Sequence, residues 1–179
     1  KVYTCTVCGA TKAEVIPMLT HDHNFTWTVI SQATVFAPEK QEGICTICGA
    51  KKTRDNGNKL TATIKLNATS IKLQKKQSTT KVKVTGLANG DSVKSWISSN
   101  KKIVTVDKSG KIKAGKKTGN AKITVTLKSG KKAILKVKVQ STKVKTTKIT
   151  GLKTNFTLKK GKSLTLKPVV APITSQEKV

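Results

Sequence analysis

Arginine, aromatic side chains and acidic side chains are scarce in this sequence. Only Arg54 among the 36 basic residues is not lysine, six residues are aromatic, and eight are acidic. With so few aromatic residues, any core must be built from Val, Ile and Leu, which suits small β-rich modules better than a large enzyme core. The scarcity of arginine argues against specific reading of phosphates or bases, which relies on the two-pronged guanidinium group.

Motifs for catalysis and membrane insertion are also missing. The sequence has no Gly-x-Ser-x-Gly, no His-Glu-x-x-His and no phosphate-binding glycine loop. Asp91 and Asp107 fall in expected turns, where short polar side chains commonly form the turn. No apolar run reaches about 18 residues, and no charged-then-apolar signal segment follows Lys1. We therefore expect neither an enzyme nor an inserted membrane protein, and we interpret the chain as a piece of a longer protein.

The basic charge is concentrated in the second part of the chain. Residues 1–59 hold 7 Lys and Arg against 5 acids, whereas residues 60–179 hold 29 against 3. Lysine alternates with apolar residues there, which places the charge on solvent-facing sides of sheets. This favours a soluble, aggregation-resistant surface. The alternative is adsorption to a polyanion, namely an anionic wall polymer, an acidic glycan or a nucleic acid.

From residue 59 onward the apolar residues recur with a period of two, and turn residues separate the short runs. The expected strands lie near residues 71–73, 82–84, 96–97, 104–106, 112–114, 123–127 and 135–139. Many short strands with regular turns are typical of a β-sandwich, which we assign to residues 59–141. Trp96 is expected to be the largest packing element of its core.

A partial repeat follows this sandwich. The stretch at residues 69–78 is echoed at residues 154–163, which indicates a tandem array. Residues 142–179 are therefore expected to start a second sandwich, which they are too short to close. We expect them to be completed by further chain or by packing on a neighbour, because an uncovered strand pair is marginal.

The sandwich carries a family resemblance. Ser95-Trp96-Ile97-Ser98-Ser99-Asn100, followed by Val104-Thr105-Val106-Asp107 and Ile123-Thr124-Val125-Thr126, resembles a bacterial immunoglobulin-like domain of group 2 over residues 61–140. That resemblance implies stacked spacer and adhesive modules of extracellular bacterial proteins. It implies an all-β, immunoglobulin-like fold, and fold alone does not give function.

The first segment contains two near-identical cysteine motifs. They are Cys5-Thr6-Val7-Cys8-Gly9-Ala10 and Cys45-Thr46-Ile47-Cys48-Gly49-Ala50. Two residues between cysteines let both thiolates face one tetrahedral ion, and the glycine permits the tight turn. We predict a structural zinc site of Cys5, Cys8, Cys45 and Cys48, with His21 or His23 as substitute ligands. Two disulfides among the same cysteines are the alternative, in any of three pairings.

The order His, Trp-Thr-Val, Ala-Thr, Gly and cysteine motif resembles short Cys/His repeats in surface proteins of Gram-positive gut anaerobes. Those repeats commonly have a cysteine after Ala-Thr, where this chain has Val35, which argues against a histidine-plus-three-cysteine site within one repeat. We assign residues 1–58 to this small β module, which buries so little that it needs a metal or disulfide staple.

Together these features predict a non-catalytic spacer of a secreted or surface protein from a Gram-positive bacterium, with adhesion as an added property. The expected partners are neighbouring domains of a longer parent chain, and a host glycoprotein or an anionic cell-wall polymer. No specific nucleic acid is expected. A polyanion-binding module acting through the lysine-rich surface is the alternative function.

Overall fold

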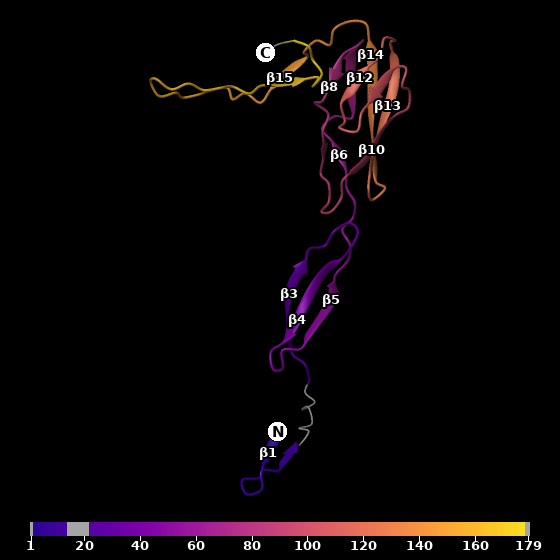
Figure 1. The fold of residues 1–179 in the computed structure, drawn as a ribbon. Coiled ribbons are helices and arrows are strands. Elements are labelled where there is room, and N and C mark those ends of the chain that lie inside the picture. The colour runs from indigo at the N-terminus through magenta and orange to yellow at the C-terminus, as the bar shows by residue number, and fades with distance from the viewer. Residues whose placement is uncertain (1, 14–21, 178–179) are drawn as a thin grey trace. The chain divides into compact units, whose positions relative to one another are not determined.

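The computed structural model describes residues 2–13 and 22–177, and within these residues every regular element is a β-strand (Figure 1). The all-β expectation is confirmed. The chain divides into two compact units. The smaller comprises Lys1–Ser31 and Lys40–Asn56, and the larger comprises Gln32–Glu39 and Gly57–Val179.

The described residues of the smaller unit form two sheets. The first is a hairpin of β1 (Val2–Thr4) and β2 (Thr11–Ala13). The second has the order β3-β4-β5, formed by β3 (Phe25–Ser31), β4 (Glu39–Cys45) and β5 (Lys51–Asn56). Within these strands only Gly43 and Cys45 are buried. So little buried surface cannot hold a module of this size by itself.

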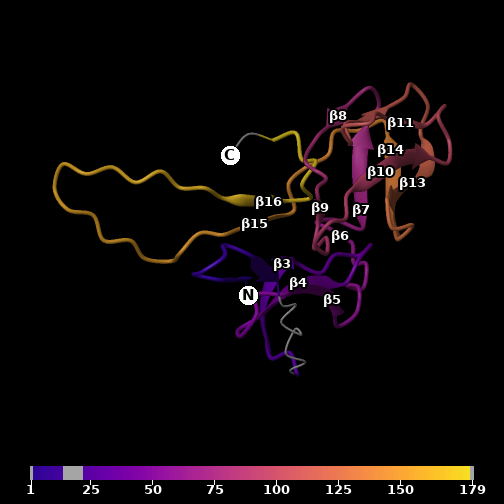
Figure 2. The same ribbon diagram turned by 60° about the horizontal axis from the view of Figure 1, so that its bottom comes forward.

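The larger unit contains a two-layered sandwich (Figure 2). One sheet has the order β10-β13-β14-β7, from β10 (Val93–Ser98), β13 (Gly119–Leu127), β14 (Lys132–Gln140) and β7 (Ser70–Gln74). The other has the order β11-β12-β8, from β11 (Val104–Val106), β12 (Ile112–Ala114) and β8 (Ser78–Thr79). A short pair of β6 (Lys65–Leu66) and β9 (Val84–Thr85) accompanies them. β7 pairs with β14 in parallel, and the other pairs are antiparallel.

The core lies between the two sheets and follows the period-two pattern. Its buried members are the aliphatic residues Ile71, Leu73, Val82, Ile103, Val104, Ile112, Ala114, Ala121, Ile123, Leu135, Val137 and Val139. Their neighbours along β13 and β14 include Lys122, Lys136 and Lys138, which are exposed. Alternation of this kind buries one face of a sheet and leaves the other in water.

Trp96 lies on the edge strand β10 and is half-buried against this core. Its ring packs on the turn between β11 and β12. A Cβ added at Gly110 would lie 2.9 Å from the Cζ2 atom of Trp96, and Gly110 has a φ of 82°. Gly110 is therefore needed for both the backbone conformation and the space.

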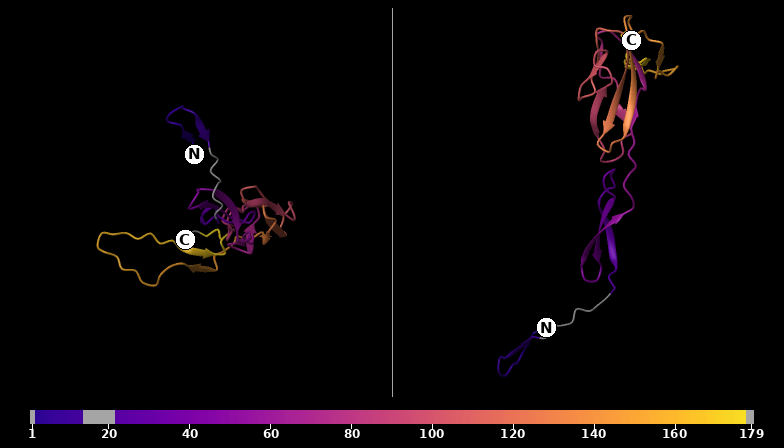
Figure 3. Two further views of the ribbon diagram at one scale, coloured as in Figure 1. Left: turned by 90° about the horizontal axis from the view of Figure 1, so that it is seen from below. Right: turned by 90° about the vertical axis from the view of Figure 1, so that its right-hand side faces the viewer.

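Residues 143–177 begin like the sandwich. β15 (Lys148–Thr150) pairs with β16 (Val169–Ala171), as β6 pairs with β9. Thr147 Oγ1 donates to the carbonyl of Ala171 at 3.1 Å, and Thr63 Oγ1 donates to the carbonyl of Gly86 at 2.6 Å. Residues 151–168 join β15 to β16 as a long loop without strand pairing (Figure 3).

Candidate metal centre

One group of potential metal ligands is brought together among the described residues, and it lies in the smaller unit. His23 Nδ1 or Nε2, Cys45 Sγ and Cys48 Sγ all lie within 4.8 Å of one another. The Sγ atom of Cys48 is 3.4 Å from Nδ1 of His23. Cys45 is 2% exposed, whereas His23 and Cys48 lie at the surface.

The strand register explains why these three residues meet. Cys45 is the last residue of β4 and pairs with Phe25, which follows closely after His23. Cys48 follows in the turn to β5, where the amide of Gly49 donates to the carbonyl of Cys45 at 2.9 Å. The amide of Thr46 donates to the carbonyl of Asn24 at 3.1 Å, which ties this turn to the backbone beside His23.

Gly49 is required in this turn for its backbone conformation. Its φ is 74°, and an added Cβ would meet nothing within 4 Å. A left-handed conformation costs little only in glycine, so its conformational freedom closes the turn that carries Cys48.

The first cysteine motif forms the same turn at residues 5–10. The amide of Gly9 donates to the carbonyl of Cys5 at 2.9 Å, and the amide of Cys5 donates to the carbonyl of Ala10 at 2.8 Å. The corresponding distances in the second motif are both 2.9 Å. A side-chain hydrogen bond with Cys8, and then backbone bonds with Cys8 and Val7, lower the pKa of Cys5. The thiolate is the form of cysteine that binds metal.

The donor set fits zinc. Thiolate sulfur and imidazole nitrogen are its preferred ligands, and Zn–S and Zn–N bonds of tetrahedral geometry place two ligand atoms about 3.6 Å apart. The 3.4 Å between Cys48 Sγ and His23 Nδ1 is close to that separation. None of the four cysteines, all of which lie in the described residues, forms a disulfide.

The predicted ligands are thus placed unequally. Cys45, Cys48 and the substitute ligand His23 form the group, while Cys5 and Cys8 lie in the β1–β2 hairpin and outside it. The joining of both motifs in one four-cysteine site stays a prediction. His21 lies outside the described residues.

A row of rings supports this group. His23 stacks on Phe25 with ring centroids 5.5 Å apart, and Phe25 contacts Trp27 at 5.6 Å. The guanidinium of Arg54 lies 3.8 Å from the Trp27 ring centroid, and its Nε donates to Gln41 Oε1 at 3.0 Å. The sequence named His23 only as a substitute ligand, whereas the structure places it beside Cys45 and Cys48.

The turn acids of the sandwich have structural partners. Asp91 accepts hydrogen bonds from Ser92 and Ser129, and Asp107 accepts them from Ser109 and Lys111. Their expected role as turn-forming residues is confirmed.

Comparison with known proteins identifies part of the chain. No curated protein matches it. In the described residues no helix is both long and apolar enough to cross a membrane. Residues 60–137, which cover most of the sandwich, match the family model of the bacterial Ig-like domain (group 2). Domains of this family are typical of bacterial surface proteins and fit a non-catalytic structural module.

Proposed function

We propose that this chain is a non-catalytic spacer of a secreted or surface protein of a Gram-positive bacterium, in which small β modules follow one another in tandem. The family match over residues 60–137 supports the surface role. The neighbouring domains of a longer parent chain are its partners. A spacer of this kind holds another domain at a distance. It can do so only if the connections between its modules, here called joints, resist bending.

The observation that carries this proposal is the attachment of residues 173–177 to the sandwich. Thr174 Oγ1 donates to the carbonyl of Lys72 at 2.6 Å, and Gln77 Nε2 donates to the carbonyl of Thr174 at 2.8 Å. Gln176 Nε2 donates to Gln74 Oε1 at 3.0 Å. Thr174 is 2% exposed, so its hydrogen bonds are shielded from water.

Apolar contacts reinforce the same joint. Ile173 packs against the sandwich core, and Val144 is buried. The amide of Gln176 donates to the carbonyl of Val144 at 3.0 Å, and Gln176 Oε1 accepts from the amide of Val144 at 3.1 Å. Residues 173–177 are thereby anchored to the sandwich by both packing and hydrogen bonds.

The loop that contains Asn89 and Gly90, at the equivalent position of the sandwich, likewise contacts another segment of the larger unit. The alignment that matches residues 69–78 with residues 154–163 also places Asn89 opposite Thr174. Asn89 Nδ2 donates to the carbonyl of Ala33 at 3.0 Å, and its own carbonyl accepts from the amide of Val35 at 3.1 Å. A Cβ at Gly90 would lie 2.7 Å from the Cβ of Thr34, so the contact is tight. We infer that this loop serves as the docking loop of each repeat.

A Thr174→Val variant of the full chain tests the joint. Valine keeps the shape of threonine but leaves the Lys72 carbonyl without its donor, which costs about 1–3 kcal/mol. Hydrogen exchange at the amide of Gln176 is expected to become roughly tenfold faster or more. The control is Thr157→Val, at an exposed threonine in the loop 151–168. Equal exchange at Gln176 in both variants would show that the joint does not anchor the second repeat.

For the smaller unit we propose structural zinc held by His23, Cys45 and Cys48. Three ligands leave one tetrahedral position, for which Cys5 or Cys8 of the first motif is the preferred occupant. An ion there would stabilise a unit whose strands bury only Gly43 and Cys45.

A further inference from the structure

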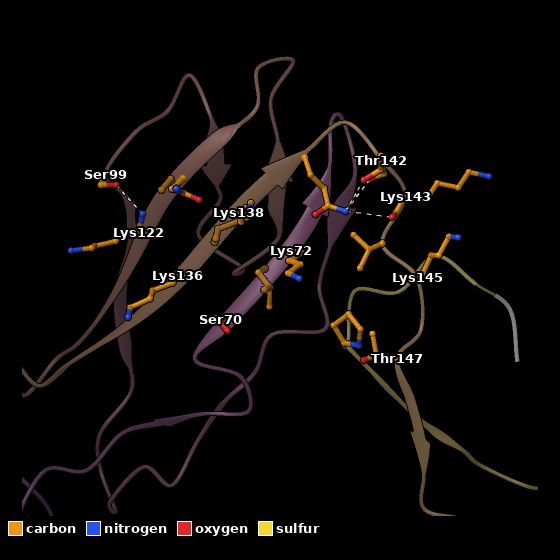
Figure 4. A pocket seen from close by; sticks show the side chains of 17 residues that line it. Ser70, Lys72, Ser99, Lys122, Lys136, Lys138, Thr142, Lys143, Lys145 and Thr147 are labelled. Atoms are coloured by element: carbon orange, nitrogen blue, oxygen red, sulfur yellow. Dashed lines mark hydrogen bonds between the residues drawn. The ribbon is translucent and has the colours of Figure 1, made fainter.

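The outer face of the sheet β10-β13-β14-β7 carries a lysine-rich groove. Its volume is about 1200 Å³, and it is lined by this face together with the chain that leaves β14. We call it the lysine groove and define it by its lining lysines, Lys72, Lys122, Lys136, Lys138, Lys143 and Lys145. Figure 4 shows the lysines of β7, β13 and β14 beside the segment that contains Lys143 and Lys145.

Strand pairing places like charges opposite one another in this groove. Lys122 pairs with Lys136 across β13 and β14, and Lys138 pairs with Lys72 across β14 and β7. Side chains in such positions start about 5 Å apart, and like charges there destabilise a sheet. A bound anion would remove that repulsion and gain attraction from several lysines at once.

Among the described residues, no carboxylate lines the groove to neutralise these charges. Of the three acids of residues 60–179, only Glu177 lies beside the groove, where it attracts Lys145. Asp91 and Asp107 hold turns, and Glu177 Oε2 accepts a hydrogen bond from the amide of Thr146 at 2.6 Å. The groove therefore concentrates positive charge in a concave site, where the field is stronger than on a flat surface.

The spacing of the lysines suits a polymer better than a single ion. Lys136 and Lys138 are alternate residues of one strand, about 6.8 Å apart, and adjacent strands lie about 4.8 Å apart. The resulting grid spans three strands. Repeated negative charges along one chain could contact lysines of all three strands together, whereas a single small anion can contact only the lysines nearest to it.

The lining also indicates the chemistry of the polymer. Among the described residues it contains no arginine, so its positive charge comes from lysine, which binds phosphate as a point charge. The described lining residues include no aromatic ring on which a base could stack, so single-stranded nucleic acid lacks its usual platform. Sugar rings likewise lack an aromatic surface against which to pack. Ser70 and Thr142 offer hydroxyl groups for polar contacts.

We propose that the lysine groove binds a linear, ring-free polyol-phosphate polymer through its phosphodiester groups. This goes beyond the spacer role and does not rest on it. The lysine groove would attach the outer face of the sandwich to an anionic polymer.

The test measures binding of the full chain to immobilised poly(glycerol phosphate) at 0.15 M NaCl and across a salt series. The groove variant is Lys72→Gln/Lys122→Gln/Lys136→Gln. The control is Lys102→Gln/Lys108→Gln/Lys113→Gln, which removes the same charge at exposed positions outside the groove. Thermal unfolding by circular dichroism verifies that both variants fold, and removal of facing lysines is not expected to lower the melting temperature.

The groove variant is expected to lose at least tenfold in affinity, and the control less than threefold. The dependence of log K on log salt should become shallower in the groove variant only, with the size of its negative slope reduced by roughly two to three. Equal losses in both variants would overturn the proposal in favour of diffuse surface charge, and absence of binding by the unmodified chain would overturn it outright. A sulfated glycan or single-stranded DNA that binds the groove as tightly as poly(glycerol phosphate) would overturn the assignment of the polymer.

Discussion

At the scale of single residues, the absence of a side chain at Gly43 shapes the smaller unit. Gly43 pairs with Trp27 across β3 and β4, and an added Cβ would lie 2.9 Å from the Trp27 ring. The ring thus lies close over the backbone of β4, and the Arg54 guanidinium lies 3.8 Å from the ring centroid. A glycine in mid-strand weakens a sheet unless an aromatic neighbour covers it, as Trp27 does here.

We therefore predict that Gly43→Ala displaces Trp27 and destabilises the smaller unit by about 1–3 kcal/mol. The measurement is urea unfolding followed by Trp27 fluorescence in a Trp96→Phe background. Ile44→Ala is the matched control, because Ile44 lies on the other face of the same strand and is 41% exposed. Equal unfolding midpoints for the two variants would show that the space above Gly43 is not needed.

At the scale of elements, the turn between β11 and β12 depends on one carboxylate. Asp107 Oδ1 accepts hydrogen bonds from the hydroxyl of Ser109 at 2.6 Å, from the amide of Ser109 at 2.9 Å and from the amide of Lys111 at 3.0 Å. The Ser109 hydroxyl and then the Lys111 amide lower the pKa of Asp107. The same turn places Gly110 against Trp96.

This carboxylate gives the sandwich a predictable pH response. Because the folded pKa of Asp107 is lowered, its contribution to stability is full above the unfolded value of about 3.9 and is lost as the pH falls through the folded pKa. Asp107→Asn should lower the melting temperature at pH 7 and flatten its decline between pH 4 and pH 2. Melting curves of this variant, with Asp55→Asn as control, measure the effect. A decline as steep as that of the unmodified protein would exclude Asp107 as its source.

The elements themselves were largely predictable from the sequence. Strands form at the expected positions around residues 71–73, 96–97, 104–106, 112–114, 123–127 and 135–139, because alternation of apolar residues is a local property of the chain. The parallel pairing of β7 with β14 was not predicted. It joins segments that lie at opposite ends of the sandwich sequence, and no local pattern distinguishes a parallel from an antiparallel neighbour.

At the scale of the whole molecule, the two units have different sources of stability. The sandwich has an aliphatic core of twelve buried residues, whereas the smaller unit has its ring row and the His23, Cys45 and Cys48 group. We expect them to unfold separately, because neither source depends on the other.

Cys45→Ser tests both the zinc proposal and this independence. Native mass spectrometry of the unmodified chain should show one zinc, which the variant loses. Amide exchange across β3, β4 and β5 should become at least tenfold faster in the variant, with the melting temperature of the sandwich unchanged. Thr46→Ser is a control in the same turn. A metal-free protein whose mass is lower by about four hydrogens would indicate two disulfides in place of zinc. Melting of both units in a single transition would disprove their independence.

By itself, the sequence determined the all-β class, the sandwich and the turns of both cysteine motifs. Each of these follows from residues near one another in the chain: alternating aliphatics, turn-forming aspartates, and glycines that can adopt a positive φ. Only the tertiary structure decided that His23 lies beside Cys45 and Cys48, since the register of β3 on β4 brings them together. It also decided that residues 32–39 and 173–177 pack with the sandwich, and that lysines from three strands share one groove. These arrangements depend on contacts between distant segments, which a local pattern cannot specify.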